Sequence, residues 1–179
     1  LLPLPAPLGY MGAEQWHQRG VSIAALNGSN IHVPFGVFSP LRGEYLDLLS
    51  NTVLPKTCQT AWDIGTGSGV LAAILAKRGI NHITATDTNP VAIATAATNF
   101  ARLGVTEQIV LSEQDLFPEG CADLIVCNPP WLPAKPSSLI ETALYDPNSQ
   151  MLRAFLSGAA AHLSEQGQAW LIMSNLAEL

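Results

Sequence analysis

Short apolar runs alternate with helical patterns from residue 60 to the end of the chain. The runs predict buried strands, in the order TAWDIG, HITATD, EQIVLSEQD, DLIVCN and GQAWLIMSN. The segments between them predict helices, namely VLAAILAKRG, an alanine-rich stretch that Asn89 caps and Gly104 ends, and SQMLRAFLSGAAAHL. Strands that alternate with helices imply right-handed crossovers and a parallel sheet covered on both faces. We therefore predict an α/β fold built on a doubly wound, mainly parallel sheet.

The first part of the chain has a different pattern. VSIAAL and NIHV flank Asn27-Gly28, a dipeptide that favours the turn of a β-hairpin. A short polar helix is expected before it, around Ala13 to Arg19. We divide the chain into an N-terminal extension with the hairpin, residues 1–38, and a main domain, residues 39–179.

The main domain is predicted to begin with a helix in SPLRGEYLDLL. Ser39 can cap this helix, and Pro40 suits its first position. Residues at helical spacing supply its apolar stripe, namely Leu41, Tyr45, Leu48 and Leu49.

Composition narrows the class of protein. The chain has 179 residues, 48% hydrophobic and 12% charged, which suits a large core in one domain with a modest extension. A net charge of -6 disfavours tight, non-specific binding to nucleic acid by this chain. Its 3 cysteines and 4 histidines lack metal-ligand spacing, so we expect no metal site and a reducing, cytoplasmic setting.

Neither a membrane span nor a signal peptide is expected. Apolar runs stay shorter than a span needs, and LLPLPAPLG lacks a basic region. The chain starts without methionine, and we interpret it as a domain from a longer protein with an additional domain or segment.

The first candidate site is DIGTGSG at the end of the first predicted strand. Glycines there let the backbone approach a ligand, and the next helix offers unpaired N–H groups to it. A tight strand-to-helix turn is the structural alternative. The nicotinamide-binding spacing is GxGxxG, whereas this chain has Gly65-x-Gly67-x-Gly69 with Asp63 two residues before. An acid at that point suits a cationic methionyl ammonium better than a diphosphate.

The second candidate is Asp87, which ends the second predicted strand about 20 residues after the glycines. An acid at this place in a doubly wound sheet accepts hydrogen bonds from both hydroxyls of a ribose. Capping of the DTNP turn is the alternative, although Asn89 can take that role. Asp87 therefore indicates an adenosine-type cofactor.

The third candidate is the end of the fourth predicted strand, where DLIVC meets Asn128-Pro129-Pro130-Trp131. Prolines donate no backbone hydrogen bond, and a residue before proline is driven into an extended conformation. The segment is therefore stiff and rich in acceptors. It can be a rigid turn with Trp131 in the core, or a rigid part of a reaction site.

The motifs DIGTGSG, ATD, QDLF and NPPW, in this order, resemble those of class I S-adenosylmethionine-dependent methyltransferases. The similarity covers about residues 35 to 176. It is greatest to the small-domain group, which includes release-factor glutamine methyltransferases and ribosomal-RNA guanine N2-methyltransferases. VFSPLRGEYL also resembles the segment before the fold in that group. The resemblance implies S-adenosylmethionine as cofactor, held by Asp63, Gly65, Thr66, Gly67, Gly69, Asp87, Asp115 and Asn128.

Within that resemblance, Asp87 would hold the ribose hydroxyls and Asp115 would lie by the adenine. The Asn128 side-chain carbonyl and the Pro129 main-chain carbonyl would each accept one N–H from the target nitrogen. That contact directs the nitrogen lone pair at the methyl group. Pro130 helps to fix the backbone, and Trp131 would stack on a planar substrate group. Tryptophan replaces the more usual tyrosine or phenylalanine here, so the substrate preference is open.

Two further features bear on the fold. Residues 132 to 148 form a loop long enough for a lid or a binding loop. The family sheet continues past the fifth strand, whereas this chain stops at Asn175–Leu179, so we expect an incomplete sheet with the fifth strand at an edge or covered by a neighbouring molecule.

The sequence thus predicts an S-adenosylmethionine-dependent N-methyltransferase. Its target would be a planar amide or amino nitrogen, either of a protein glutamine or of an RNA or DNA base. Two alternatives remain, a non-catalytic binding module of the same fold and an NAD-dependent oxidoreductase.

Overall fold

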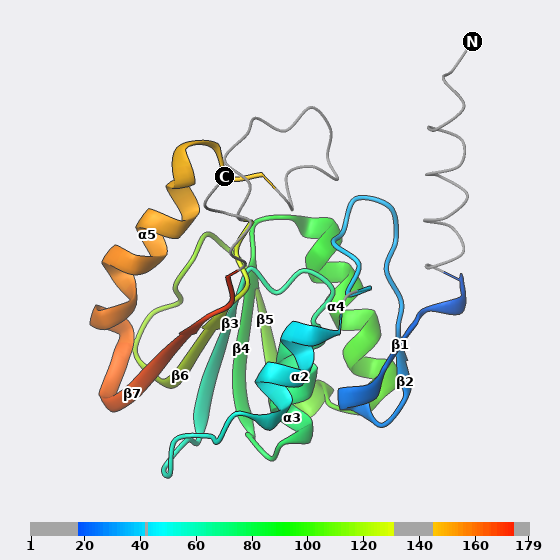
Figure 1. The fold of residues 1–179 in the computed structure, drawn as a ribbon, viewed down its shortest axis with the longest axis horizontal. Helices are drawn as coiled ribbons and strands as arrows, with labels where there is room; N and C mark the ends of the chain where they lie inside the picture. The colour runs from blue at the N-terminus through cyan, green and yellow to red at the C-terminus, as the bar shows by residue number, and fades with distance from the viewer. Residues whose placement is uncertain (1–17, 42, 131–144, 174–179) are drawn as a thin grey trace.

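Parallel strands form a five-stranded sheet at the centre of the molecule (Figure 1). The structure is a computed structural model and describes residues 18–41, 43–130 and 145–173. The strand order is β5-β4-β3-β6-β7, and every neighbouring pair is parallel. The strands are β3 (Thr60–Ile64), β4 (His82–Asp87), β5 (Ile109–Glu113), β6 (Ala122–Cys127) and β7 (Leu163–Leu171). The predicted doubly wound α/β fold is confirmed.

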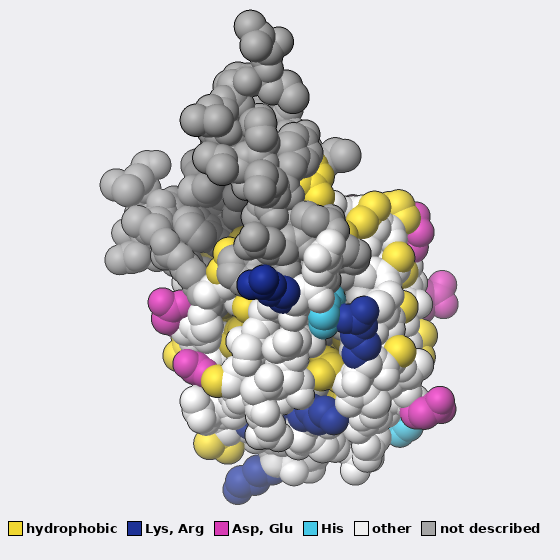
Figure 2. All heavy atoms as spheres, turned by 90° about the vertical axis from the view of Figure 1, so that its right-hand side faces the viewer, with side chains coloured by type: hydrophobic (Ala, Val, Ile, Leu, Met, Phe, Trp, Pro, Cys, Tyr) yellow, Lys and Arg dark blue, Asp and Glu magenta, His cyan; other side chains and the backbone are white. Residues whose placement is uncertain are grey.

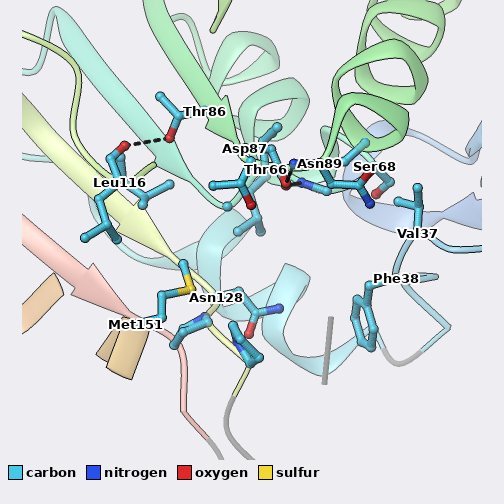
Figure 3. Close-up of a pocket in the computed structure, with 18 of the residues that line it drawn as sticks. Val37, Phe38, Thr66, Ser68, Thr86, Asp87, Asn89, Leu116, Asn128 and Met151 are labelled. Atoms are coloured by element: carbon cyan, nitrogen blue, oxygen red, sulfur yellow. Dashed lines mark hydrogen bonds between the residues drawn. The ribbon is translucent and has the colours of Figure 1, made fainter. Parts of the chain in front are cut away.

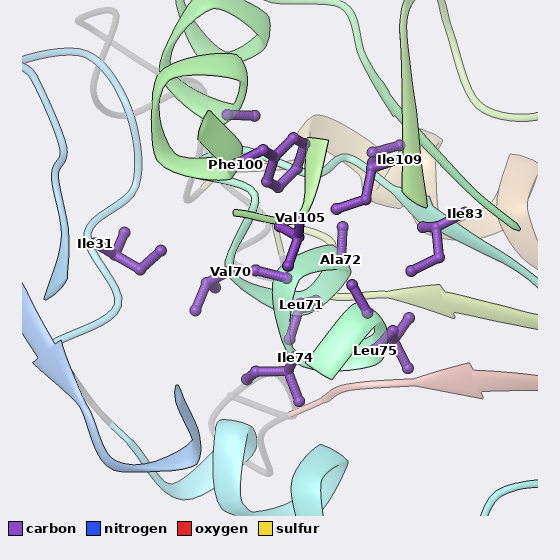
Figure 4. Packing of buried hydrophobic residues seen from close by; sticks show 14 of the residues in the cluster. Ile31, Val70, Leu71, Ala72, Ile74, Leu75, Ile83, Phe100, Val105 and Ile109 are labelled. Atoms are coloured by element: carbon purple, nitrogen blue, oxygen red, sulfur yellow. The ribbon is translucent and has the colours of Figure 1, made fainter. Parts of the chain in front are cut away.

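Apolar side chains cover both faces of the sheet. On one face Ala61 and Leu124 pack with α3 (Val70–Lys77) and α4 (Pro90–Leu103), part of which Figure 4 shows. On the other face Trp62 and Ile125 pack with Phe155. Phe155 belongs to α5 (Gln150–Gly158). Successive residues of a strand point to opposite faces, so one short apolar run serves two cores.

The predicted hairpin is present. Strands β1 (Val21–Ile23) and β2 (Ser29–Ile31) pair antiparallel. A short 3-10 helix, η1 (Ala24–Leu26), and Asn27 at φ 55° make the turn. Ile31 of β2 is buried in the same cluster as helix α3. The hairpin therefore shares its core with the sheet, while the division at residue 38 stays a prediction.

The predicted start of the next helix is wrong. Helix α2 (Glu44–Asn51) begins after Gly43, and Ser39 does not cap it. The Ser39 hydroxyl is buried and has no hydrogen-bond partner in the described part of the chain. Leu41 and Leu48 are 54% and 66% exposed, so they do not form the buried stripe. The chain lines a cavity at residues 36–38, before α2 begins, and again at Tyr45 within α2.

Other boundaries differ less from the prediction. The Asn89 side chain caps α4, and Gly104 ends it in the left-handed conformation, as predicted. The helix predicted up to residue 163 ends sooner, and β7 begins earlier than expected, with a register shift against β6. The described ranges also contain the short 3-10 helices η2 (Thr106–Gln108), η4 (Pro147–Ser149) and η5 (Ala159–His162).

Strand β7 lies at one edge of the sheet among the described residues. Most of the helix predicted at Ala13 to Arg19 and of the predicted loop 132–148 lies outside the described residues, as does Asn175–Leu179. None of the helices in the described ranges is long and apolar enough to cross a membrane.

Basic side chains gather on the face shown in Figure 2, with acidic side chains towards its edges. Two of the molecule's basic residues bind the ends of helices. The Lys77 ammonium donates to the Leu103 carbonyl of α4, and the Arg78 guanidinium donates to carbonyls of Leu49 and Thr52 at the end of α2. Cations are favourable there because helix carbonyls carry partial negative charge. These two charges therefore stabilise helix ends.

Candidate active site

A cavity lies at the carboxyl ends of β3, β4 and β6 (Figure 3). The chain order reverses between β3 and β6, because β4 and β5 extend the sheet one way and β6 the other. Such a reversal point opens a crevice for ligands in doubly wound sheets. The lining includes Gly36, Val37, Phe38, Tyr45, Gly65, Thr66, Gly67, Ser68, Asp87, Asn89, Asp115, Leu116, Asn128, Pro129, Pro130 and Met151. Most of the predicted site residues therefore meet in one place.

The glycine turn after β3 presents bare backbone to the cavity. Gly65 and Gly67 have φ of 71° and 54°, a region that other residues rarely adopt. The Thr66 amide between them donates to the Thr86 carbonyl at 2.8 Å, which fixes the turn to β4. A Cβ at Gly65 would lie 3.1 Å from Met151 Cε. The cavity is therefore kept open by the absence of side chains at this turn.

Gly69 has a different role from its neighbours. Its φ is 82°, and a Cβ there would lie 2.5 Å from the Phe100 ring of α4. It is absent from the cavity lining. Gly69 therefore lets α3 pack closely on α4, and its predicted contact with a cofactor stays a prediction.

Asp63 lies behind the cavity lining and is completely buried. Its Oδ2 accepts hydrogen bonds from Thr66 Oγ1 at 2.7 Å and from the Ala72 amide at 3.0 Å. Its Oδ1 has no partner within the described ranges. Burial raises the pKa of Asp63 to about 6, with a smaller contribution from Asp87, against the lowering effect of the two hydrogen bonds. Asp63 thus holds the turn to helix α3, and its contact with an ammonium group stays a prediction.

Asp87 lies in the cavity wall and connects β4 to the glycine turn. Its Oδ2 accepts from the Gly67 amide and its Oδ1 from the Asn89 amide, both at 2.9 Å. The cap of α4 comes from Asn89, whose Oδ1 accepts from the Val91 amide. A carboxylate has about four acceptor sites, so Asp87 can still accept hydrogen bonds from hydroxyl groups of a ligand.

Asp115 and Leu116 supply another part of the wall. Asp115 is exposed, so its side chain can reach a ligand from solvent. Leu116 has φ of 48°, and its carbonyl accepts from Thr86 Oγ1 at 2.8 Å. Asp115 was predicted from the QDLF motif, which also contains Leu116, but no role was predicted for Leu116. Its place in the wall depends on this unusual backbone conformation.

Asn128 follows the last residue of β6 and borders the cavity together with Pro129 and Pro130. Its side chain is half-buried and makes no hydrogen bond to another described residue. In Figure 3 the amide group lies between Met151 and Phe38. Trp131 lies outside the described residues, so its stacking role stays a prediction.

Sequence reasoning missed several residues of the lining. Phe38 and Tyr45 belong to VFSPLRGEYL, which resembles a family segment and was predicted to begin a helix with Tyr45 in its apolar stripe, but neither residue was predicted to line a site. Burial, and to a lesser degree Asp63, raises the pKa of the Tyr45 phenol above its usual range, which keeps it neutral. Met151 had no signal in the sequence, because it reaches the cavity from α5.

The sequence matches a known family over most of its length. A family model described as "Methyltransferase small domain" matches residues 29–178. The chain belongs to this family. The recognition made from the four motifs is thereby confirmed, and the nicotinamide alternative loses its support.

Two curated relatives carry related names. The chain is 36% identical over 135 residues to a release factor glutamine methyltransferase of Cereibacter sphaeroides, with 67% of this chain and 48% of the relative covered. It is 28% identical over 180 residues to a ribosomal protein uL3 glutamine methyltransferase of Bordetella pertussis, with 90% and 57% covered. The chain thus spans about half the length of these relatives.

A solved structure agrees in fold. Ribosomal protein L11 methylase from Lactobacillus delbrueckii subsp. bulgaricus superposes with a TM-score of 0.58 at 26% identity. The match covers 80% of this chain and 66% of that chain.

The lining fits S-adenosylmethionine, the predicted cofactor and the cofactor of this family. A nucleoside needs a carboxylate for its ribose hydroxyls and apolar contacts for its base. Asp87 offers the carboxylate, its two oxygens fixed by backbone amides. Leu116 and Val37 offer apolar contacts, and the glycine turn leaves room for close approach.

Proposed function

We propose that the protein methylates a planar amide nitrogen, the side-chain nitrogen of a protein glutamine, with S-adenosylmethionine as methyl donor. The observation that carries this proposal is that one cavity is lined by the glycine turn, Asp87 and the Asn128-Pro129-Pro130 segment. A cofactor site and a set of rigid acceptors therefore share one space. The names of the relatives support a protein target, because release factor, uL3 and L11 are all proteins.

The chemical difficulty is the weak nucleophilicity of an amide. The cofactor supplies a methyl group made electrophilic by its sulfonium. The Asn128 side-chain carbonyl and the Pro129 carbonyl accept the two N–H groups of the target amide, which orients its nitrogen. In the transfer, the nitrogen would form one bond to the methyl carbon as the sulfur–carbon bond broke with its electron pair going to sulfur, and one N–H proton would leave to solvent.

Pre-organisation supports this role for Asn128. Asn128 lines the cavity, and its side chain has no hydrogen bond to any other described residue. Proline fixes φ at Pro129 and Pro130, and Asn128 is restricted by the proline after it. The Pro129 carbonyl and the backbone that carries the Asn128 side chain are therefore restricted before the substrate arrives, which reduces the reorganisation needed during the reaction.

We also propose a cytoplasmic setting, which the three free cysteines support.

Transfer of the tritiated methyl group from labelled S-adenosylmethionine to cell-extract fractions tests the proposal. Asn128→Ala should lower kcat about 100-fold, by analogy with loss of one oriented hydrogen-bonding group. Binding of S-adenosylhomocysteine should remain. Asn81→Ala, an exposed asparagine before β4, is the matched control and should keep full activity. Label should appear on a glutamine after peptide mapping.

The outcomes separate the alternatives. If ribonuclease removed the label from cell-extract fractions, the target would be a nucleic-acid base and not a protein. Binding of S-adenosylhomocysteine without transfer to any fraction would indicate a non-catalytic module. Full activity of Asn128→Ala would contradict the assigned role of Asn128.

A further inference from the structure

Two parts of the cavity wall come from distant parts of the sequence. Val37 and Phe38 follow the hairpin, and Figure 3 places Phe38 across from Asn128. Ser68 belongs to the glycine turn and is buried. We call residues 36–38 the cover segment. Its position relative to the glycine turn sets the width of the cavity, so the contacts that hold the two together matter for any ligand.

Asn99 of α4 binds the glycine turn and also the chain four residues before the cover segment. Its Oδ1 accepts from the His32 amide, and its Nδ2 donates to the His32 carbonyl, both at 2.9 Å. The same Nδ2 donates to the Ser68 carbonyl at 2.9 Å. Asn99 is completely buried. One side chain therefore fixes both the backbone just before the cover segment and the backbone of the glycine turn.

Only a side-chain amide can make this set of bonds. The site needs one acceptor and two donors in a plane, which an aspartate, a leucine or a serine cannot supply. The next residue, Phe100, packs on Gly69, so α4 contacts the turn at two successive positions. The cover segment itself is bound by Asn89, whose Nδ2 donates to the Gly36 carbonyl at 3.5 Å. The hydrogen bonds of Asn99 are shorter, and they act on the backbone at His32, four residues before the cover segment.

We infer that Asn99 is a positioning residue that sets cofactor affinity by fixing the cover segment against the glycine turn. It does not line the cavity itself and acts through Ser68 and the backbone that leads to Val37 and Phe38. This inference rests on the proposed function, because it assigns a residue that supports the same cofactor site.

Titration calorimetry with S-adenosylhomocysteine tests the inference. Asn99→Leu keeps the number and branching of the side-chain heavy atoms and removes all three hydrogen bonds, and Asn99→Ser is a smaller side chain in case the first variant does not fold. Asp123→Ala is the control, because it removes several hydrogen bonds, two of them half-buried, at the other end of the sheet. All variants are compared at a temperature where circular dichroism shows them folded.

The Kd of Asn99→Leu should rise at least tenfold and that of Asn99→Ser severalfold, while Asp123→Ala stays within twofold of wild type. KM for S-adenosylmethionine should rise in parallel, with KM for the acceptor protein unchanged. Folded Asn99 variants with wild-type Kd would overturn the inference. Wild-type protein that fails to bind S-adenosylhomocysteine would instead overturn the proposed function and, with it, the inference that depends on it.

Discussion

At the scale of single residues, the buried carboxylate of Asp63 lowers the stability of the folded protein when it is ionised. The carboxylate is completely buried, and only one of its oxygens has hydrogen-bond partners in the part of the chain described. Burial raises its pKa to about 6. At neutral pH the residue is therefore ionised in a place that favours its neutral form.

This raised pKa predicts a pH dependence of stability. The folded pKa of Asp63 lies above the unfolded value, so its contribution to the free energy of unfolding is present below about pH 4 and is lost as pH rises through 6. A shift of about two units corresponds to about 3 kcal/mol. Asp63→Asn should not lose stability over this pH range and should therefore be more stable than wild type at pH 7.

Urea unfolding of wild type and Asp63→Asn between pH 4 and 7 checks this expectation. Asp47→Asn, which changes an exposed acid of α2, controls for the loss of one negative charge. Parallel stability curves for wild type and Asp63→Asn would show that the Asp63 proton has no linkage to folding.

At the scale of elements, Asp146 fixes the start of helix α5. It is 5% exposed, and its oxygens accept from the amides of Met151 and Leu152, each at 3.1 Å. Met151 lies in the first turn of α5 and in the cavity wall. A carboxylate at this end also interacts favourably with the partial positive charge of the helix. The cap thus positions one wall of the site.

Removal of this cap should affect both the helix and the cavity. Asp146→Ala leaves two amides unsatisfied, and we expect it to lower the free energy of unfolding by about 1 to 2 kcal/mol. Asp146→Asn keeps one acceptor oxygen and should lower the free energy of unfolding by a smaller amount. Thermal unfolding gives the stability, and calorimetry should show weaker binding of S-adenosylhomocysteine to Asp146→Ala. Unchanged stability and unchanged affinity would contradict this role of Asp146.

At the scale of the whole molecule, Asp123 joins three strands at the end of the sheet opposite the cavity. Its Oδ2 accepts from the Gln59 amide and from the amide and hydroxyl of Thr60, at 2.9 to 3.0 Å. Its Oδ1 accepts from Ser164 Oγ at 2.7 Å. Burial alone would raise the pKa of Asp123, but these hydrogen bonds outweigh it and lower the value to about 2. The starts of β3, β6 and β7 are tied through one carboxylate.

The lowered pKa gives the opposite pH dependence from that of Asp63. The contribution of Asp123 to stability is present above about pH 4 and is lost as pH falls towards 2. At pH 7, Asp123→Ala should lower the free energy of unfolding by about 1 to 3 kcal/mol through the lost hydrogen bonds. Urea unfolding at pH 7 and at pH 3 measures both effects. A variant as stable as wild type at pH 7 would contradict the assigned tie between the strands.

The order of strands and helices, the parallel sheet and the turn at the end of β3 were determined by the sequence alone. Apolar periodicity is a local property, and so are the signals at Asn89 and Gly104 that begin and end α4. The carboxyl ends of parallel strands meet at one edge, so Asp87 and Asn128 could be assigned to one crevice before the structure was known.

Tertiary structure alone decided which side chains complete that crevice. Met151 reaches it from α5, and Asn99 binds His32 across 67 positions of sequence. Helix α2 starts at Glu44 and ignores the local start signal at Ser39 and Pro40. Gly69 was grouped with the ligand-binding glycines because only its distance to Phe100 reveals a packing role. Contacts between distant segments follow from packing in three dimensions and leave no periodic signal in the sequence.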